Sequence, residues 1–160
     1  MTRIGLVSVG VLALVAGVAT WVMAAEGQDI PEGLTFLGAP VTADQIALGQ
    51  DLYAANCASC HGANLEGQPD WRRRTEDGRM PAPPHDASGH TWRHADRQLF
   101  TITRLGVGAA VPGYESDMPA YEGLLSDDEI AAILAFIKST WPERERELQA
   151  EVTANDEDGS

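Results

Sequence analysis

Cysteine is scarce in this sequence: the 160-residue chain contains only Cys57 and Cys60. A closed structural zinc site needs about four nitrogen and sulfur ligands, so these two thiols supply half of one. A redox-active dithiol of the thioredoxin type would lie beside a βαβ pattern, and the sequence has no strand pattern. Both thiols nevertheless lie in one short stretch, NCASCHG at 56–62, where His61 directly follows the second.

The order C-x-x-C-H is the attachment motif of a c-type haem. Each thiol adds across a vinyl group of the porphyrin, and the adjacent imidazole becomes the proximal ligand of the iron. The main prediction is therefore one covalent haem c, attached at Cys57 and Cys60, with His61 as an axial ligand. A bare redox dithiol and half of a zinc site are the alternatives.

Basic residues are also few: 11 Lys and Arg face 24 Asp and Glu, so the formal net charge is −13. Without residues 1–25 the balance is 10 against 24, a charge of −14. This excess of negative charge argues against nucleic acid and anionic membrane surfaces as partners. The negative charge suits docking to a redox partner with a basic surface. Alternatively, it is the charge of a highly solvated protein and has no role in recognition.

Charge is absent from residues 4–23, a run of 20 residues that follows Arg3. This length favours a retained membrane anchor, while the small residues at Ala24 and Ala25 suit cleavage of a signal peptide. Residues 1–25 are thus predicted to be one or the other. Because Arg3 should stay inside, both place the remaining chain outside the cytoplasm, either on the periplasmic side of the membrane or free in the periplasm.

The remaining chain predicts an all-α domain with long loops. Residues 26–41 have no periodicity and are expected to be a linker. Thr42 can cap a helix that leads into Cys57, and a short helix fits Asp96–Leu105. Residues 63–94 contain four prolines and three glycines, which exclude a long element there.

The clearest helix is predicted in SDDEIAAILAFIKSTW, residues 126–141. Ser126 and Glu129 form a capping box, and apolar residues recur at helical spacing on one face. Residues 143–160 are a charged tail, expected to be helical to about Val152 and disordered beyond.

Three motifs in order, GQDLYAANCASCHG, SDMPAY and LSDDEIAAILAFIKSTW, resemble those of class I c-type cytochromes across residues 42–142. The resemblance implies a helical fold around one haem, with the first and last helices crossing beside it. It also implies that Gly49 and Tyr53 pack against Leu134, Phe136 or Ile137. The activity it implies is one-electron transfer between redox partners.

The second axial ligand is expected to be Met118, which precedes Pro119 in the loop where the family places this ligand. A thioether there would raise the reduction potential and close the site to substrates. Met80, also followed by proline, is the rival. The remaining candidates are the loop histidines, His85, His90 and His94, which could instead hold a further copper or zinc ion or take ordinary hydrogen-bonding roles.

Arginines are concentrated between residues 71 and 104, which hold seven of them. Guanidinium groups suit haem propionates, so one or two of the seven are expected to contact a propionate, and the Trp92 indole could donate likewise. One family feature has no obvious counterpart. The proline carbonyl that orients the proximal histidine usually lies about a dozen residues downstream, but Pro69 falls short of that position and Pro81 lies beyond it.

The sequence as a whole favours a periplasmic electron carrier rather than an enzyme. Two alternatives stay open. The protein could be a haem enzyme or gas sensor with an exchangeable sixth ligand, or it could be the cytochrome subunit of a larger, membrane-bound oxidoreductase.

Overall fold

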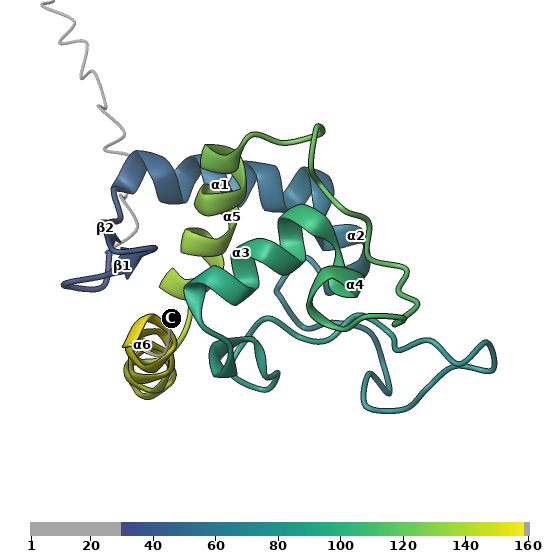
Figure 1. Cartoon of the computed structure of the whole chain (residues 1–160). Coiled ribbons are helices and arrows are strands. Elements are labelled where there is room, and N and C mark those ends of the chain that lie inside the picture. Colours follow the sequence, from purple (N-terminus) through teal and green to yellow (C-terminus); the bar gives the residue numbers. More distant parts are fainter. Residues whose placement is uncertain (1–29, 159–160) are drawn as a thin grey trace, which may run out of the picture.

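The computed structural model describes residues 30–158 (Figure 1). The anchor or signal peptide expected at residues 1–25 lies outside this range and stays a prediction. Among the described residues, no helix has both the length and the apolar character needed to cross a bilayer.

The described part of the chain is mostly helical, which confirms the predicted fold class. A small antiparallel hairpin, β1 (Thr35–Phe36) and β2 (Ala39–Pro40), precedes the helices. The helical elements are α1 (Ala43–Asn56), α2 (Ala58–His61), the 3-10 helix η1 (Thr91–Arg93), α3 (Asp96–Leu105), α4 (Val107–Ala110), α5 (Asp127–Ser139) and α6 (Glu143–Asp158). The long connection between α2 and η1 carries no helix or strand.

Helices α1 and α5 begin where their capping residues predict. The Thr42 hydroxyl accepts the Gln45 N–H at 3.2 Å. At α5, the Ser126 side chain accepts the Glu129 N–H while the Glu129 carboxylate accepts the Ser126 N–H, a complete capping box. Both caps satisfy backbone donors that the first helical turn leaves unpaired.

Helix α5 forms the centre of the core because it is apolar almost all round. Its side chains from Ile130 to Ile137 are buried, apart from Ala131, which is partly buried. Helix α1 crosses it (Figure 1) and presents Ile46, Gly49 and Tyr53 to the contact. The Tyr53 and Phe136 rings lie 5.6 Å apart, so the expected contact of Tyr53 with Phe136 is confirmed.

Gly49 permits the closest approach between α1 and α5. A Cβ atom at this position would lie 2.0 Å from the Ala132 carbonyl oxygen and 2.9 Å from the Phe136 Cβ. The nearest neighbours of Gly49 on α5 are thus Ala132 and Phe136, and Phe136 is one of the three partners that the resemblance implies. A backbone oxygen cannot rotate away as a side chain can.

We therefore expect Gly49→Ala to destabilise the protein although alanine favours a helix interior by about 0.5–1 kcal/mol. Overpacking costs roughly 1–3 kcal/mol, and the backbone contact places Gly49 at the upper end. Chemical denaturation should show this loss. Gly108→Ala in α4 is the control, since its Cβ would meet only the Tyr114 oxygen at 3.8 Å. Equal effects of the two substitutions would contradict close packing at Gly49.

The segment expected to be a linker contributes to the core within the described residues. Leu34, Phe36 and Val41 are buried, and β1 packs against α5. The Leu37 N–H donates to the Asp96 carboxylate at 2.9 Å, a bond across 59 residues. These contacts fasten residues 30–41 to the core although most of the other side chains in the segment are exposed, because apolar residues spaced by turns can pack without any helical or strand period.

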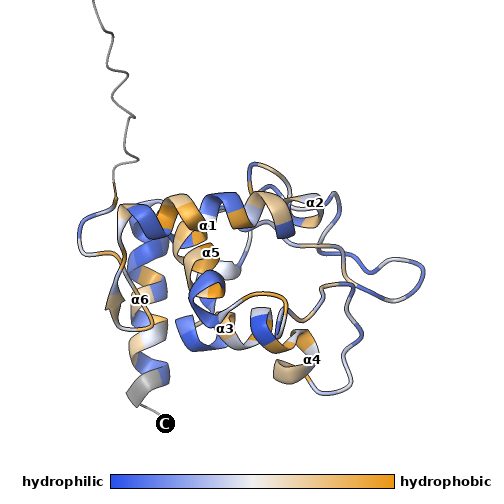
Figure 2. Ribbon diagram, turned by 90° about the horizontal axis from the view of Figure 1, so that it is seen from above, coloured by the Kyte–Doolittle hydropathy of each residue, from blue (hydrophilic) through white to orange (hydrophobic). Residues whose placement is uncertain are grey.

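Helix α6 also differs from the expected tail, since it continues past Val152 to Asp158. Figure 2 shows it to be largely hydrophilic, yet Glu145 and Gln149 are buried. The Gln149 amide donates to Asp96 at 2.6 Å and to the Thr153 hydroxyl at 3.0 Å. These polar contacts, rather than an apolar face, hold α6 against the start of α3.

Candidate functional site

The two cysteines and His61 lie on a single helical turn at the end of α1. The Cys57 N–H donates to the Tyr53 carbonyl and closes α1, while the N–H groups of Cys60 and His61 both donate to the Cys57 carbonyl, at 3.1 and 2.9 Å. Gly62 ends the turn with a φ of 83°, a conformation that favours glycine. Both thiols are free; Cys57 is half-buried and Cys60 exposed.

The Cys57 thiol is unlike that of a redox dithiol. Burial raises its pKa to about 11, although a hydrogen bond with Tyr121 acts in the opposite direction. Reactive cysteines need a depressed pKa, because the thiolate is the nucleophile. This disfavours the bare redox alternative.

The His61 ring is oriented by a proline carbonyl after all. Its Nδ1 lies 2.9 Å from the Pro83 oxygen, 22 residues downstream. Burial lowers the pKa of His61, while the bond to Pro83 acts to raise it. The ring is therefore neutral near pH 7 and its Nε2 is left for a metal, as metal-bound histidines require.

The acceptor lies far along the sequence because the intervening loop closes on itself. The Gln68 N–H donates to the Ala82 carbonyl at 2.9 Å, and the Ala82 N–H donates to the Gln68 side chain at 2.7 Å. Residues 69–81 project from the body as a separate loop (Figures 1 and 2). Because the loop closes in this way, Pro83 reaches the place that a proline about a dozen residues downstream of His61 would occupy. The number of residues between His61 and Pro83 therefore does not predict this contact.

A cavity of about 570 Å³ opens beside the C-x-x-C-H turn, within the range typical of cofactor sites. Cys57, Cys60 and His61 form part of its wall. The opposite walls are largely apolar and come from α3, α5 and the two proline-containing loops; they include Leu99, Ile102, Ile133, Leu134, Ile137, Pro81, Pro83 and Pro119. A cavity of this volume and lining can enclose a large apolar group.

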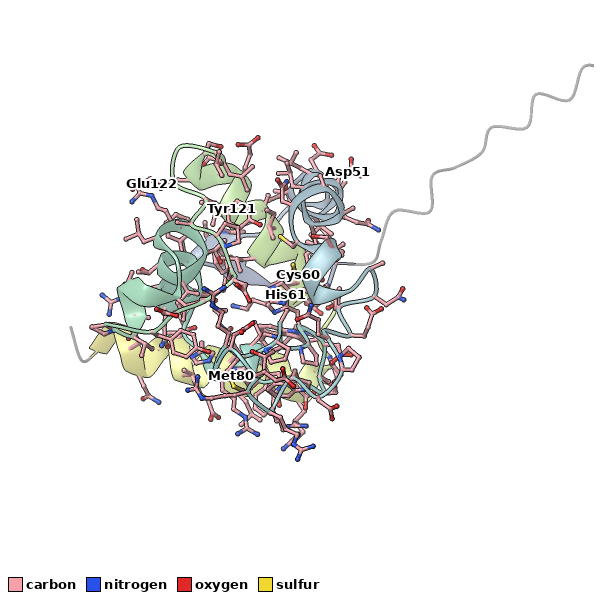
Figure 3. All side chains as sticks on the ribbon, turned by 90° about the vertical axis from the view of Figure 1, so that its right-hand side faces the viewer. Asp51, Cys60, His61, Met80, Tyr121 and Glu122 are labelled. Atoms are coloured by element: carbon pink, nitrogen blue, oxygen red, sulfur yellow. The ribbon has the colours of Figure 1, made fainter. Side chains whose placement is uncertain are left out.

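Met118 and Met80 both line this cavity. Their loops are joined by an ion pair between the residues that precede them, Arg79 and Asp117. The Met118 N–H also donates to the Ser116 hydroxyl at 3.1 Å. In Figure 3, Cys60 and His61 lie between Tyr121 on one side and Met80 on the other. The structure thus brings both candidate thioethers to the cavity that contains His61.

Two tyrosine hydroxyl groups bind backbone carbonyls on either side of the C-x-x-C-H turn, one from α1 and one from the loop that contains Met118, and the sequence predicts neither contact. The Tyr121 hydroxyl donates to the Asn56 carbonyl at 2.6 Å, and the Tyr53 hydroxyl donates to the Gly62 carbonyl at 2.8 Å. Burial raises the pKa of Tyr121 to about 12, so it remains a donor. The only indication in the sequence is that Tyr121 follows Met118 by three residues. This spacing does not reveal that the Tyr121 hydroxyl binds the Asn56 carbonyl.

The three loop histidines also line the cavity. His85 Nδ1 lies 2.8 Å from the Thr91 hydroxyl and His94 Nδ1 lies 3.1 Å from the Gln98 side chain, while the His90 ring stacks on Trp71 with centroids 5.3 Å apart. Across residues 30–158, no three His, Cys, Asp or Glu side chains are grouped so as to hold a metal ion. A further copper or zinc site therefore finds no support among them.

None of the seven arginines between residues 71 and 104 lines the cavity wall. Three form ion pairs: Arg79 with Asp117, Arg97 with Asp156, and Arg104 with Glu122 and Asp127. At the rim, the Arg72 guanidinium lies 4.1 Å from the ring centroid of Trp71, which does line the cavity. The Trp92 indole donates to the Ala87 carbonyl at 3.4 Å. Contact of an arginine with a propionate remains a prediction.

Comparison with known proteins agrees with this geometry, since the family profile of cytochrome c matches residues 46–141. The chain belongs to the cytochrome c family. Among its relatives, cytochrome c6 of Tetradesmus obliquus is 33% identical over 96 residues, covering 58% of this chain and 86% of the relative. Cytochrome c6 of Anabaena variabilis is 27% identical over 92 residues, covering 56% and 84%. No significant match to a solved structure was found.

The protein is therefore a class I c-type cytochrome, an electron carrier whose cofactor is a covalently bound haem c. The residues present fit that group. Two thiols and a neutral imidazole share one helical turn, and the cavity beside them is mostly apolar. The Cys57 and Cys60 pair matches the C-x-x-C-H pattern that such attachment needs.

Proposed function

We propose that this cytochrome carries single electrons outside the cytoplasm, with haem c attached through Cys57 and Cys60 and ligated by His61 and Met118. The observation that carries the proposal is the single cavity lined by all four residues. The haem supplies a one-electron redox centre. The chain supplies the attachment, the ligands and an apolar enclosure that excludes water and helps to set the potential.

The loop that contains Met118 is built to hold a flexible side chain in place. Pro119 restricts the backbone at Met118 to extended geometry, and the Ser116 hydroxyl accepts the Met118 N–H. Tyr121 then fixes the end of the loop to α1 through Asn56. A methionine fixed at the iron leaves no position for substrate, which favours an electron carrier over an enzyme or gas sensor.

The proposed setting is the periplasm, with the N-terminal segment either retained as an anchor or removed. The excess of acidic residues suits redox partners that are basic at their docking surface. Docking should be brief, over an interface below roughly 1,200 Å² in total. Association within a larger oxidoreductase complex would use the same chemistry and would be seen as co-purification from membranes.

Covalent attachment is tested by replacing both cysteines. Cys57→Ala/Cys60→Ala should lose the haem on a denaturing gel stained for peroxidase activity, because no thioether can form. Each single variant keeps one thiol and should retain some stain. Wild-type protein matured in a cell that makes c-type cytochromes should gain the mass of one haem. A colourless wild type with the mass of the bare chain would reject the proposal.

A further inference from the structure

One short segment, Pro83–His85, contacts the proximal imidazole in two different ways. Its Pro83 carbonyl lies 2.9 Å from His61 Nδ1. Two residues later, the His85 ring lies flat on the His61 ring, with centroids 4.0 Å apart and an interplanar angle of 22°. The first contact is made at the edge of the imidazole and the second on its face.

His85 is itself held from several sides. Its N–H donates to the Leu65 carbonyl at 2.7 Å, and its carbonyl accepts the Trp141 indole N–H at 2.7 Å. Its Nδ1 lies 2.8 Å from the hydroxyl of Thr91, which is buried in η1. The Tyr53 ring lies edge-on to it, at 6.4 Å and 72°. Contacts from α1, from the loop after α2, from η1 and from the residue segment that follows α5 therefore fix the position of His85.

The two contacts restrict the orientation of His61 in different ways. When an imidazole binds iron through Nε2, a hydrogen bond at Nδ1 holds one edge of the ring and favours one orientation. A single hydrogen bond can bend, however, and so allows part of the rotation about the iron–nitrogen bond. A ring packed on the face resists it directly, because rotation would drive the two rings together and protein interiors leave little room for such movement.

We infer that His85 is a positioning residue that holds the proximal imidazole of His61 in one rotational orientation, through ring stacking anchored by Thr91, Leu65 and Trp141. The inference rests on the proposed ligation by His61. It gives His85 a role distinct from the ligand and metal-site roles weighed for it in the sequence. Because imidazole orientation affects overlap with the iron orbitals, His85 should also influence the reduction potential.

The test uses the holoprotein in its oxidised, paramagnetic form, in which the spread of the haem-methyl NMR resonances reports the plane of the axial imidazole. His85→Leu removes the stacked ring and should change this spread and shift the reduction potential. His85→Phe keeps a flat ring and should retain most of the wild-type pattern. Thr91→Val keeps the imidazole but releases Nδ1, so it should move the resonances in the same direction as His85→Leu, by less.

Thr101→Val is the matched control for Thr91→Val, because Thr101 does not line the cavity and its hydroxyl donates to the Arg97 carbonyl within α3. It should leave the methyl pattern unchanged. The inference is overturned if His85→Leu retains the wild-type pattern, or if Thr101→Val or His85→Phe changes it as much as His85→Leu does. Should His85→Leu fail to fold, Thr91→Val decides by the same criterion. Absence of covalent haem from the wild type would instead reject the proposed function.

Discussion

Replacing Met118 by alanine is expected to abolish the weak near-infrared absorption that methionine–iron ligation gives in the oxidised protein. It should also let carbon monoxide bind rapidly to the reduced protein at neutral pH, because the sixth position of the iron would be open. Loss of the thioether should lower the reduction potential, since methionine ligation raises it. The measurements are the absorption spectra of both oxidation states, with and without carbon monoxide.

Met80→Ala is the matched control for Met118→Ala. Both methionines precede a proline, both line the cavity, and the adjoining residues Arg79 and Asp117 form an ion pair. Tyr121 anchors the Met118 loop to α1, whereas Met80 belongs to residues 69–81, the loop that projects from the body (Figure 1). Met80→Ala should therefore retain the near-infrared band. If that substitution removed the band and Met118→Ala kept it, Met80 would be the ligand.

Features set by neighbouring residues were predictable from the sequence. Thr42 and Ser126 cap helices because their hydroxyl groups reach backbone N–H groups three residues ahead. The C-x-x-C-H turn places two thiols and an imidazole on one turn for the same local reason. In each case the partners are close along the chain, so composition and spacing are sufficient.

Features set by distant partners were not predictable. Pro83 accepts from His61 only because the loop between Gln68 and Ala82 closes on itself. The tail beyond Val152 is predicted to be disordered because its sequence is highly charged, but α6 continues there: the Thr153 hydroxyl accepts the Asp96 N–H and Asp156 pairs with Arg97. One turn earlier, the buried amide of Gln149 reaches Asp96 across 53 residues. Nothing in the local pattern distinguishes Gln149 from a solvated glutamine.

Asp96→Ala is expected to destabilise the protein by about 3–5 kcal/mol, the usual cost of removing one partner of a buried ion pair. Asp96 and Lys138 are 2% and 5% exposed, and the ammonium lies 3.0 and 3.3 Å from the two carboxylate oxygens. The carboxylate also accepts the Leu37 N–H and the Gln149 amide. Its loss would leave the buried ammonium of Lys138 without its counter-ion and the Leu37 N–H without its acceptor.

Lys138→Met should cost less than Asp96→Ala, because the carboxylate keeps its bonds from Leu37 and Gln149. The double variant should be more stable than the sum of the two losses predicts, since removing both partners leaves no unpaired charge.

Arg97→Ala is the control for Asp96→Ala. Arg97 is next to Asp96 but forms an exposed pair with Asp156, so its loss should cost only about 0–1 kcal/mol. Urea unfolding of the holoprotein measures all four. If Asp96→Ala cost no more than Arg97→Ala, the buried pair would not be what joins the hairpin, α3, α5 and α6.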